Sequence, residues 1–268
     1  MKRRRSRSGA KLGQHFLTAP TVADALADAA NIQPEDTVLE IGPGKGILTR
    51  ALLSRGARIV AVEKDPELVT VLTTSLHNEI QNGTLTLINA DIRDVSPERL
   101  GLKKGGYVLA ANIPYYITGE IIRTFLSRDA QPHTIALLVQ KEVAERIARS
   151  PKESLLSLSV KAYGSPRYVQ TVKRGSFSPP PSVDSAVITI TNISRSKFEG
   201  ISEDAFFEIL HAAFAAKRKL LISNLARAFA KDAVLKACAE CGVQENARAE
   251  DVHIETWMCL VKHLQGNH

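Results

Sequence analysis

Short apolar runs alternate with amphipathic stretches along the first half of the chain. The runs are rich in Val, Ile and Leu, and the stretches between them place apolar residues at helical spacing. The predicted strands are residues 37–41, 58–63, 85–91, 107–112 and 134–140. This alternation favours a parallel, doubly wound α/β sheet. Residues 167–175 and 185–193 follow as two strands without a helix between them, which predicts an antiparallel hairpin at one sheet edge.

The C-terminal part of the chain has a different pattern. Beyond about residue 194 the strand signal disappears, and residues 203–240 are helical in composition and spacing throughout. The polar segment 194–202 is the best candidate for a linker. We therefore predict a basic, flexible tail over residues 1–13, an α/β domain over 14–193 and a small all-helical domain over 194–268.

The composition is that of an ordinary globular protein, with 44% hydrophobic and 24% charged residues in a chain of 268. No apolar run approaches the length of a membrane span, and the N-terminus lacks the apolar stretch of a signal peptide, so we expect no membrane association. Three cysteines do not make a disulfide framework, which fits a cytoplasmic protein. Cys238 and Cys241, with Cys259 and His253 further on, show no metal-binding spacing. We interpret them as incidental, partly buried thiols and expect no metal.

Positive charge is concentrated in two places. Lys and Arg total 35 against 28 for Asp and Glu, which gives a net charge of +7. One basic cluster precedes the first acidic residue, Asp24, and the other is Lys217-Arg218-Lys219. Two separate clusters on a basic chain favour a polyanionic partner such as nucleic acid. We expect the N-terminal tail to contact RNA phosphates, with a solubilising role as the alternative.

A glycine-rich turn joins the first long strand to the helix that follows it. Gly42, Gly44 and Gly46 let the chain turn tightly and let a ligand approach the backbone. Glu63 ends the next strand, where nucleotide-binding folds place an acid that accepts ribose hydroxyls, and Asp91 ends the third. The spacing is G-x-G-x-G, tighter than the dinucleotide fingerprint. It resembles the first motif of S-adenosylmethionine-dependent methyltransferases and predicts that cofactor.

The fourth strand ends in Asn112-Ile113-Pro114-Tyr115. The amino group of a nucleobase is a poor nucleophile because its lone pair is delocalised into the ring. Two acceptors that hold both N–H groups let the lone pair turn toward a methyl donor, and the Asn112 side chain and the backbone carbonyl next to Pro114 can supply them. Tyr115 can stack on a base taken out of its helix or loop. We interpret the segment as a clamp for the target amine, with an ordinary strand-to-turn exit as the alternative.

These motifs resemble those of the small-subunit rRNA adenine N6-dimethyltransferases. The matching segments are "KLGQHFL", "VLEIGPGKGILT", "VEKD", "NADIRD", "NIPYYIT", "FSPPPSVDSAV", "HAAFAAKRKLLISNL" and "RAEDVHIETWMCL". The cofactor motifs alone would also admit the macrolide-resistance methyltransferases of large-subunit rRNA, but "FSPPPSVDSAV" and "AFAAKRKLLISNL" resemble the small-subunit family more closely. The resemblance implies a class I, Rossmann-like methyltransferase domain followed by a helical domain that recognises rRNA.

The resemblance also implies which residues bind the cofactor. They are His15, Leu17, Gly42, Gly44, Glu63, Asp91 and Asn112. The two glycines would line the methionine part of S-adenosylmethionine, Glu63 its ribose and Asp91 its adenine. His15 stands where the family most often has Asn, and both side chains offer a hydrogen-bonding nitrogen.

The same resemblance assigns residues to the RNA substrate. Asn112 would lie between the cofactor and the target amine, with Pro114 and Tyr115 completing the clamp. Phe177 would pack on the target base from the other side, unless it is an ordinary core residue. The RNA contacts would include Lys217, Arg218 and Lys219.

The family activity that the resemblance implies is the transfer of four methyl groups. Two go to each of two adjacent adenines in the 3′-terminal hairpin of 16S rRNA, on a late assembly intermediate of the small subunit. We expect a monomeric, cytoplasmic enzyme. The alternatives are a non-catalytic assembly or RNA-binding factor, a resistance-type methyltransferase of large-subunit rRNA and a DNA adenine methyltransferase. A pure assembly factor would be expected to lose the clamp or a cofactor acid, and both are intact here.

Overall fold

The structure is a computed structural model that describes residues 15–266. The predicted tail over residues 1–13 lies outside the described residues. No helix in the described range is long and apolar enough to cross a membrane.

The chain forms two compact units. The first contains the residues up to Ala144 together with Arg167–Thr191, and the second contains Glu145–Pro166 together with the chain from Asn192 onward. The prediction places 145–166 in the α/β domain instead. Within the second unit, the ring of Tyr163 lies 5.1 Å from that of Phe198, which explains why this stretch joins the helical part.

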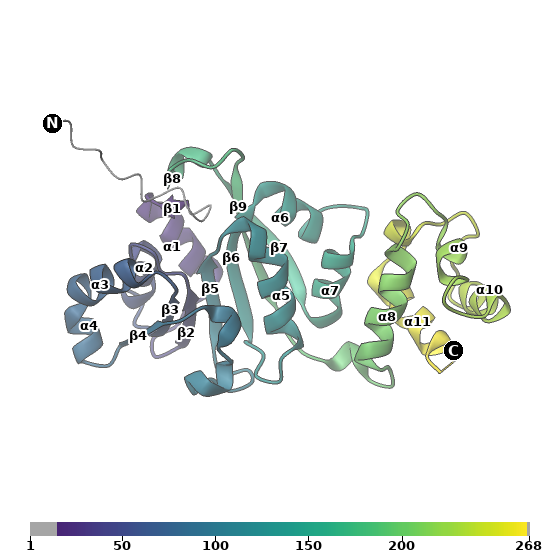
Figure 1. The fold of residues 1–268 in the computed structure, drawn as a ribbon, viewed down its shortest axis with the longest axis horizontal. Helices are drawn as coiled ribbons and strands as arrows, with labels where there is room; N and C mark the ends of the chain where they lie inside the picture. Colours follow the sequence, from purple (N-terminus) through teal and green to yellow (C-terminus); the bar gives the residue numbers. More distant parts are fainter. Residues whose placement is uncertain (1–14, 267–268) are drawn as a thin grey trace. The chain divides into compact units, whose positions relative to one another are not determined.

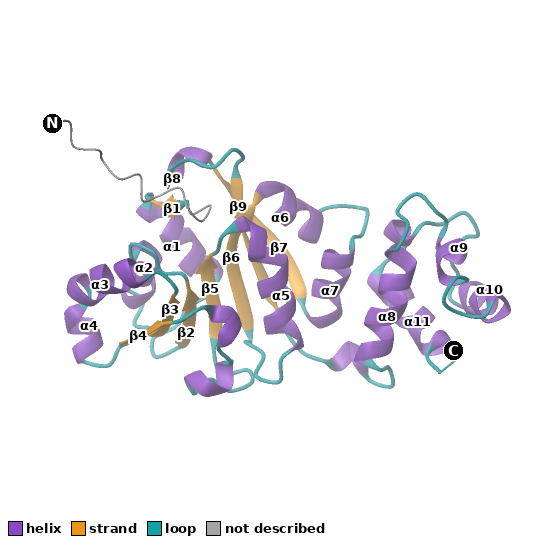
Figure 2. Cartoon of the chain, viewed as in Figure 1, coloured by secondary structure: helices purple, strands orange, loops and turns teal. Residues whose placement is uncertain are grey.

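A mostly parallel, seven-stranded sheet forms the centre of the first unit (Figures 1 and 2), as predicted. Its strands are β2 (Thr37–Ile41), β3 (Arg58–Glu63), β4 (Leu85–Asn89), β5 (Val108–Asn112), β6 (Thr134–Gln140), β7 (Ser165–Val172) and β9 (Ser185–Thr191). The order is β4-β3-β2-β5-β6-β9-β7, and β9 runs antiparallel to β6. The two strands predicted as an edge pair are therefore neighbours at the sheet edge, with β7 outermost.

Helices precede, connect and follow the parallel strands and cover their apolar side chains. They are α1 (Pro20–Ala29), α2 (Ile47–Leu53), α3 (Pro66–Ser75), α4 (His77–Gln81), α5 (Thr118–Ser127) and α6 (Lys141–Ala148). The central strands β5 and β6 are almost fully buried, as expected for strands covered on both faces. Pro66 at the start of α3 and the Asp65 side chain, which accepts from the Glu67 N–H at 2.9 Å, fix that helix's beginning.

The register of the parallel strands brings their carboxyl ends to one edge. Ile41 of β2 lies opposite both Val62 of β3 and Ala111 of β5. The residues that follow these three strands therefore gather above the same edge of the sheet. This edge is where open α/β sheets bind ligands.

A second, two-stranded sheet joins residues that are far apart in the sequence. β1 (Phe16–Leu17) pairs antiparallel with β8 (Phe177–Ser178), so that Leu17 lies opposite Phe177. The pairing is extended by His15, whose Nδ1–H donates to the Pro179 carbonyl at 2.8 Å. The first described residues are thus held in place by the segment that precedes β9.

The second unit is helical, as the composition predicts. Its helices are α7 (Leu155–Tyr163), α8 (Glu203–Phe214), α9 (Leu221–Leu225), α10 (Lys231–Glu240) and α11 (Ile254–Leu264). Trp257 of α11 is completely buried, and its indole N–H donates to the Val252 carbonyl at 2.9 Å. Trp257 is therefore a core residue of this unit, as its helical spacing indicates.

The basic cluster 217–219 lies in a turn between α8 and α9, although the composition predicts helix there. The side chain of Asn224 is buried, and its Nδ2 donates to the carbonyls of Ala213 at 2.7 Å and Ala216 at 3.1 Å. Ala213 lies in the last turn of α8, so its carbonyl would otherwise lack an intrahelical partner, whereas the Ala216 carbonyl also accepts from the Lys219 N–H at 3.0 Å. The Asn224 side chain thus caps the end of α8, and the three cations lie on the exposed turn that follows.

The interpretation of the cysteines as incidental thiols is wrong for two of the three. Cys241 and Cys259 form a disulfide that links the end of α10 to α11, with their Cα atoms 5.8 Å apart. Cys238 is a buried free thiol, as predicted. The sequence spacing of 18 residues between the bonded cysteines matches no common motif, and only the packing of α10 against α11 brings them together.

Candidate active site

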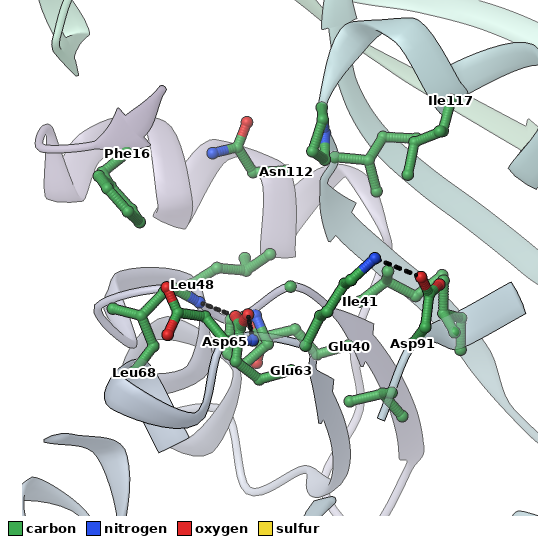
Figure 3. Close-up of a pocket in the computed structure, with 18 of the residues that line it drawn as sticks. Phe16, Glu40, Ile41, Leu48, Glu63, Asp65, Leu68, Asp91, Asn112 and Ile117 are labelled. Carbon is green, nitrogen blue, oxygen red and sulfur yellow. Dashed lines mark hydrogen bonds and ion pairs between the residues drawn. The ribbon is translucent and has the colours of Figure 1, made fainter. Parts of the chain in front are cut away.

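A pocket opens at the carboxyl edge of β2, β3 and β5 in the first unit. Figure 3 shows Phe16 and Asn112 on one side of it and Glu63 and Asp91 on the other. The pocket is lined by all of the predicted cofactor residues: His15, Leu17, Gly42, Gly44, Glu63, Asp91 and Asn112. Pro114 and Tyr115 also line it. The fold therefore brings the predicted cofactor residues and the predicted clamp into one cavity.

The glycine turn lies between β2 and α2, and Gly42 and Gly44 present backbone without a side chain to the pocket. Gly44 has a φ of +58°, and a Cβ there would lie 3.2 Å from the Phe16 ring. Gly46 has a φ of +77°, and a Cβ there would lie 2.9 Å from Leu72 Cδ2. Left-handed backbone together with these close neighbours requires glycine at both positions.

Glu63 is buried and braces the glycine turn. Its Oε2 accepts from the Gly44 N–H at 3.1 Å, and its Oε1 accepts from the Asp65 N–H at 2.9 Å. A carboxylate can accept about four hydrogen bonds, so each oxygen keeps capacity for a ligand hydroxyl. Glu63 therefore supports the loop and can still take the predicted ribose contact.

Asp91 is more fully engaged than the sequence indicates. Its carboxylate accepts from Lys64 Nζ at 2.8 Å and from Arg93 Nη2 at 2.6 Å, Nε at 3.0 Å and the backbone N–H at 3.1 Å. The Arg93 hydrogen bonds, together with Lys64, hold the pKa of Asp91 well below its usual range. Because four donors occupy the carboxylate, the predicted adenine contact requires one of these cations to move aside.

Glu40 is a pocket residue that motif spacing alone did not single out. It lies in β2 with no exposed surface, and neither carboxyl oxygen has a hydrogen-bond partner among the described residues. Burial raises the pKa of Glu40 to about 8, and the nearby Glu63 carboxylate adds to the increase. A Glu inside an apolar strand was the available signal.

Two open acceptors define the clamp. The Asn112 Nδ2 donates to the His15 carbonyl at 3.2 Å, which leaves the amide oxygen Oδ1 without a donor among the described residues. The Pro114 carbonyl already accepts from the Ile117 N–H at 3.2 Å, whereas no described residue donates to the Ile113 carbonyl. Of the two carbonyls next to Pro114, that of Ile113 is therefore the better acceptor for a second N–H.

Tyr115 is fixed at the pocket wall by its hydroxyl and by its ring. The hydroxyl hydrogen-bonds the buried Ser185 Oγ at 2.6 Å, and the ring stacks with that of His15 at a centroid distance of 5.8 Å. Burial raises the pKa of Tyr115, so the phenol stays neutral. These contacts suit a positioning surface, because the phenol is not poised to remove a proton.

Phe177 does not line the pocket, although it lies opposite Leu17, which does. It is 3% exposed and packs in the hydrophobic core with residues such as Leu17, Val22 and Val172. In this conformation Phe177 offers no open ring face to a base. The predicted stacking of Phe177 on the target base therefore requires β1 and β8 to rearrange, and it stays a prediction.

Comparison with known proteins identifies the family of this chain. A family model described as "Ribosomal RNA adenine dimethylase" matches residues 5–266. The chain belongs to this family. Its relatives include "Ribosomal RNA small subunit methyltransferase A" of Dehalococcoides mccartyi, 39% identical over 262 residues, which cover 96% of this chain and 88% of the relative. The Fusobacterium nucleatum protein of the same name is 37% identical, with 96% and 97% covered.

Two solved structures share the fold over nearly the whole chain. A dimethyladenosine transferase from Plasmodium falciparum has a TM-score of 0.75 at 25% identity and covers 92% of this chain and 96% of its own. The 23S rRNA methyltransferase ErmE has a TM-score of 0.72 at 26% identity, with 93% and 99% covered. The predicted class I methyltransferase fold is confirmed.

As a ribosomal RNA adenine dimethylase, the protein uses S-adenosylmethionine to dimethylate adenine in rRNA. The pocket residues fit this cofactor. The glycine turn leaves room where a Cβ would lie, and Glu63 offers an acceptor for hydroxyl groups. The predicted cofactor and reaction are thus confirmed, while the separate residue roles stay predictions.

Proposed function

We propose that this dimethylase methylates N6 of two adjacent adenines in the 3′-terminal hairpin of 16S rRNA during late assembly of the small subunit. It acts as a cytoplasmic monomer and transfers four methyl groups in all. The main support is the open acceptor pair at Asn112 and Ile113 beside the cofactor pocket, which a non-catalytic assembly factor would not need. The choice of subunit rests on relatives at 37–39% identity named for the small subunit, against 26% for the 23S rRNA enzyme.

The acceptor pair prepares the amine for attack. Asn112 Oδ1 and the Ile113 carbonyl each accept one N–H of the adenine amino group, which turns the nitrogen lone pair away from the ring and toward the methyl donor. S-adenosylmethionine supplies the methyl group as an electrophile already activated by its positive sulfur. The reaction therefore needs no metal ion, and the chain contributes mainly positioning and electrostatics.

The target base must leave its stack to reach these acceptors. Tyr115, held by Ser185 and flanked by His15, offers an aromatic surface beside the clamp. Next to it, Tyr116 is 70% exposed and lines the same pocket, so that an apolar ring is available at the rim. Stacking on such rings compensates a base for the contacts that it loses on flipping.

The proposal is tested by methyl transfer from tritiated S-adenosylmethionine to unmethylated small ribosomal subunits, with the RNA then digested to nucleosides. We expect label in N6,N6-dimethyladenosine of the small-subunit RNA and none with purified large subunits. Label on large-subunit RNA would assign the protein to the resistance-type enzymes. Measurable binding to small subunits without transfer would support the assembly-factor alternative.

The basic turn gives a separate prediction about RNA affinity. Lys217, Arg218 and Lys219 are exposed, and no acidic side chain among the described residues pairs with them. Replacing all three with Gln is expected to weaken binding to small subunits and to reduce the slope of log K against log salt by about 2 to 3. Filter binding at salt concentrations from about 50 to about 300 mM measures the slope. The control is the replacement of Lys103 and Lys104 with Gln, because both are exposed and lie before the amino end of β5. An unchanged slope in the triple variant would exclude the turn from the interface.

A further inference from the structure

A cluster of metal-binding side chains lies in the second unit, apart from the active site. Cys241 follows the last residue of α10, and Cys259 and His263 lie on α11. The potential ligand atoms of these three residues all lie within 4.8 Å of one another. The buried Cys238 is not part of the cluster.

The geometry of α11 explains why two of the three converge. Cys259 and His263 are four residues apart, a spacing that places both side chains on the same helix face. Cys241 reaches this face from α10, as its Cα lies 5.8 Å from that of Cys259. The cysteines are partly buried and His263 is exposed, so an ion can reach the cluster from solvent.

Glu240 lies beside the histidine. Its Oε2 lies 2.8 Å from His263 Nδ1, within ion-pair distance. Histidines that bind zinc commonly donate their other N–H to a carboxylate, which fixes the tautomer and the ring direction.

We propose that Cys241, Cys259 and His263 form a zinc site when the disulfide between the two cysteines is reduced. Two thiolates and one imidazole are preferred zinc ligands, and the fourth tetrahedral position is open to water. The disulfide and the metal are mutually exclusive, because sulfur atoms bonded to each other are not available as thiolates. In reducing surroundings zinc replaces the disulfide as the link between α10 and α11.

The chemistry balances with a dithiol as reductant. The dithiol gives two electrons and two protons to the Cys241–Cys259 bond and itself becomes a cyclic disulfide. Zinc then displaces one proton from each cysteine thiol, and the neutral His263 ring binds without losing a proton. Binding therefore releases two protons and is favoured by rising pH.

The test uses the full-length protein, reduced with a dithiol and freed of it without air. Titration with Co²⁺ is expected to give one equivalent of a tetrahedral spectrum with a thiolate charge-transfer band, which Zn²⁺ abolishes by displacement. Cys259→Ser and His263→Ala are expected to weaken binding at least 10-fold, and Glu240→Gln about 10-fold or more. Cys238→Ser is the matched control and should bind like the wild type.

Several outcomes would overturn the proposal. They are the absence of a thiolate band in the reduced wild type, equal affinity in Cys259→Ser, or equal affinity in the oxidised wild type. Thermal unfolding separates a lost site from a lost fold. Zinc is expected to raise the Tm of the reduced wild type and of Cys238→Ser, and to leave the Tm of a folded Cys259→Ser unchanged.

Discussion

Replacing Asn112 with Ala is expected to lower the rate of methyl transfer by about 100-fold or more. The variant loses Oδ1, which we propose accepts one N–H of the target amine, so the lone pair is no longer directed at the methyl donor. Asn112 is half-buried, so its removal leaves the core intact, although it also removes the hydrogen bond to the His15 carbonyl. Single-turnover transfer to unmethylated small subunits, with enzyme in excess, measures the chemical step directly.

Two controls separate the acceptor from general damage at the pocket. Ser185→Ala removes the partner of the Tyr115 hydroxyl but leaves both acceptors in place, so a smaller loss is expected. Equilibrium binding of S-adenosylmethionine to Asn112→Ala should change only a few-fold, since the glycine turn and Glu63 are untouched. A transfer rate within about threefold of the wild type would rule out Asn112 as an essential acceptor.

Replacing Glu40 with Gln is expected to remove a pH dependence from the stability of the protein. The pKa of Glu40 is raised from its usual value of 4.5 to about 8 in the folded chain, chiefly by burial. The folded state therefore keeps a proton that the unfolded state releases between these two values. The contribution is fully present below pH 4.5 and is lost as pH rises through 8. In that window it falls by about 1.4 kcal/mol per pH unit.

Urea unfolding at several pH values from about 5 to about 9 measures how the free energy of unfolding of the two proteins changes with pH. Glu40→Gln keeps the shape of the neutral carboxyl, so its advantage over the wild type should grow with pH and level off above about 8. Glu67→Gln, at an exposed position in the first turn of α3, should show no such trend. Parallel curves for Glu40→Gln and the wild type would mean that Glu40 does not change its protonation on folding.

The elements that determine the pocket could be predicted from local sequence. The runs at 37–41, 58–63 and 134–140 coincide with β2, β3 and β6, because a strand buried on both faces must be apolar along its length. Once the strands are parallel, their carboxyl ends share one edge, and the glycine turn and Asn112 must meet there. These conclusions need no knowledge of side-chain packing.

Features that depend on packing at long range could not be predicted. The side chain of Asn224 caps the end of α8, whereas composition alone predicts that the helix continues through residues 215–220. The pairing of Cys241 with Cys259 depends on how α10 packs against α11. The engagement of Asp91 by Lys64 and Arg93 arises from side chains on two neighbouring loops. In each case the partner is chosen by three-dimensional proximity, which periodicity does not encode.

The pairing of β1 with β8 has a consequence for the order in which the enzyme becomes competent. His15 is bound to the Pro179 carbonyl across a separation of 164 residues, and the His15 carbonyl in turn orients Asn112. A nascent chain still lacking Ser178 lacks the strand that holds the His15 segment beside Asn112. We therefore expect the clamp to align only after this late segment has been translated.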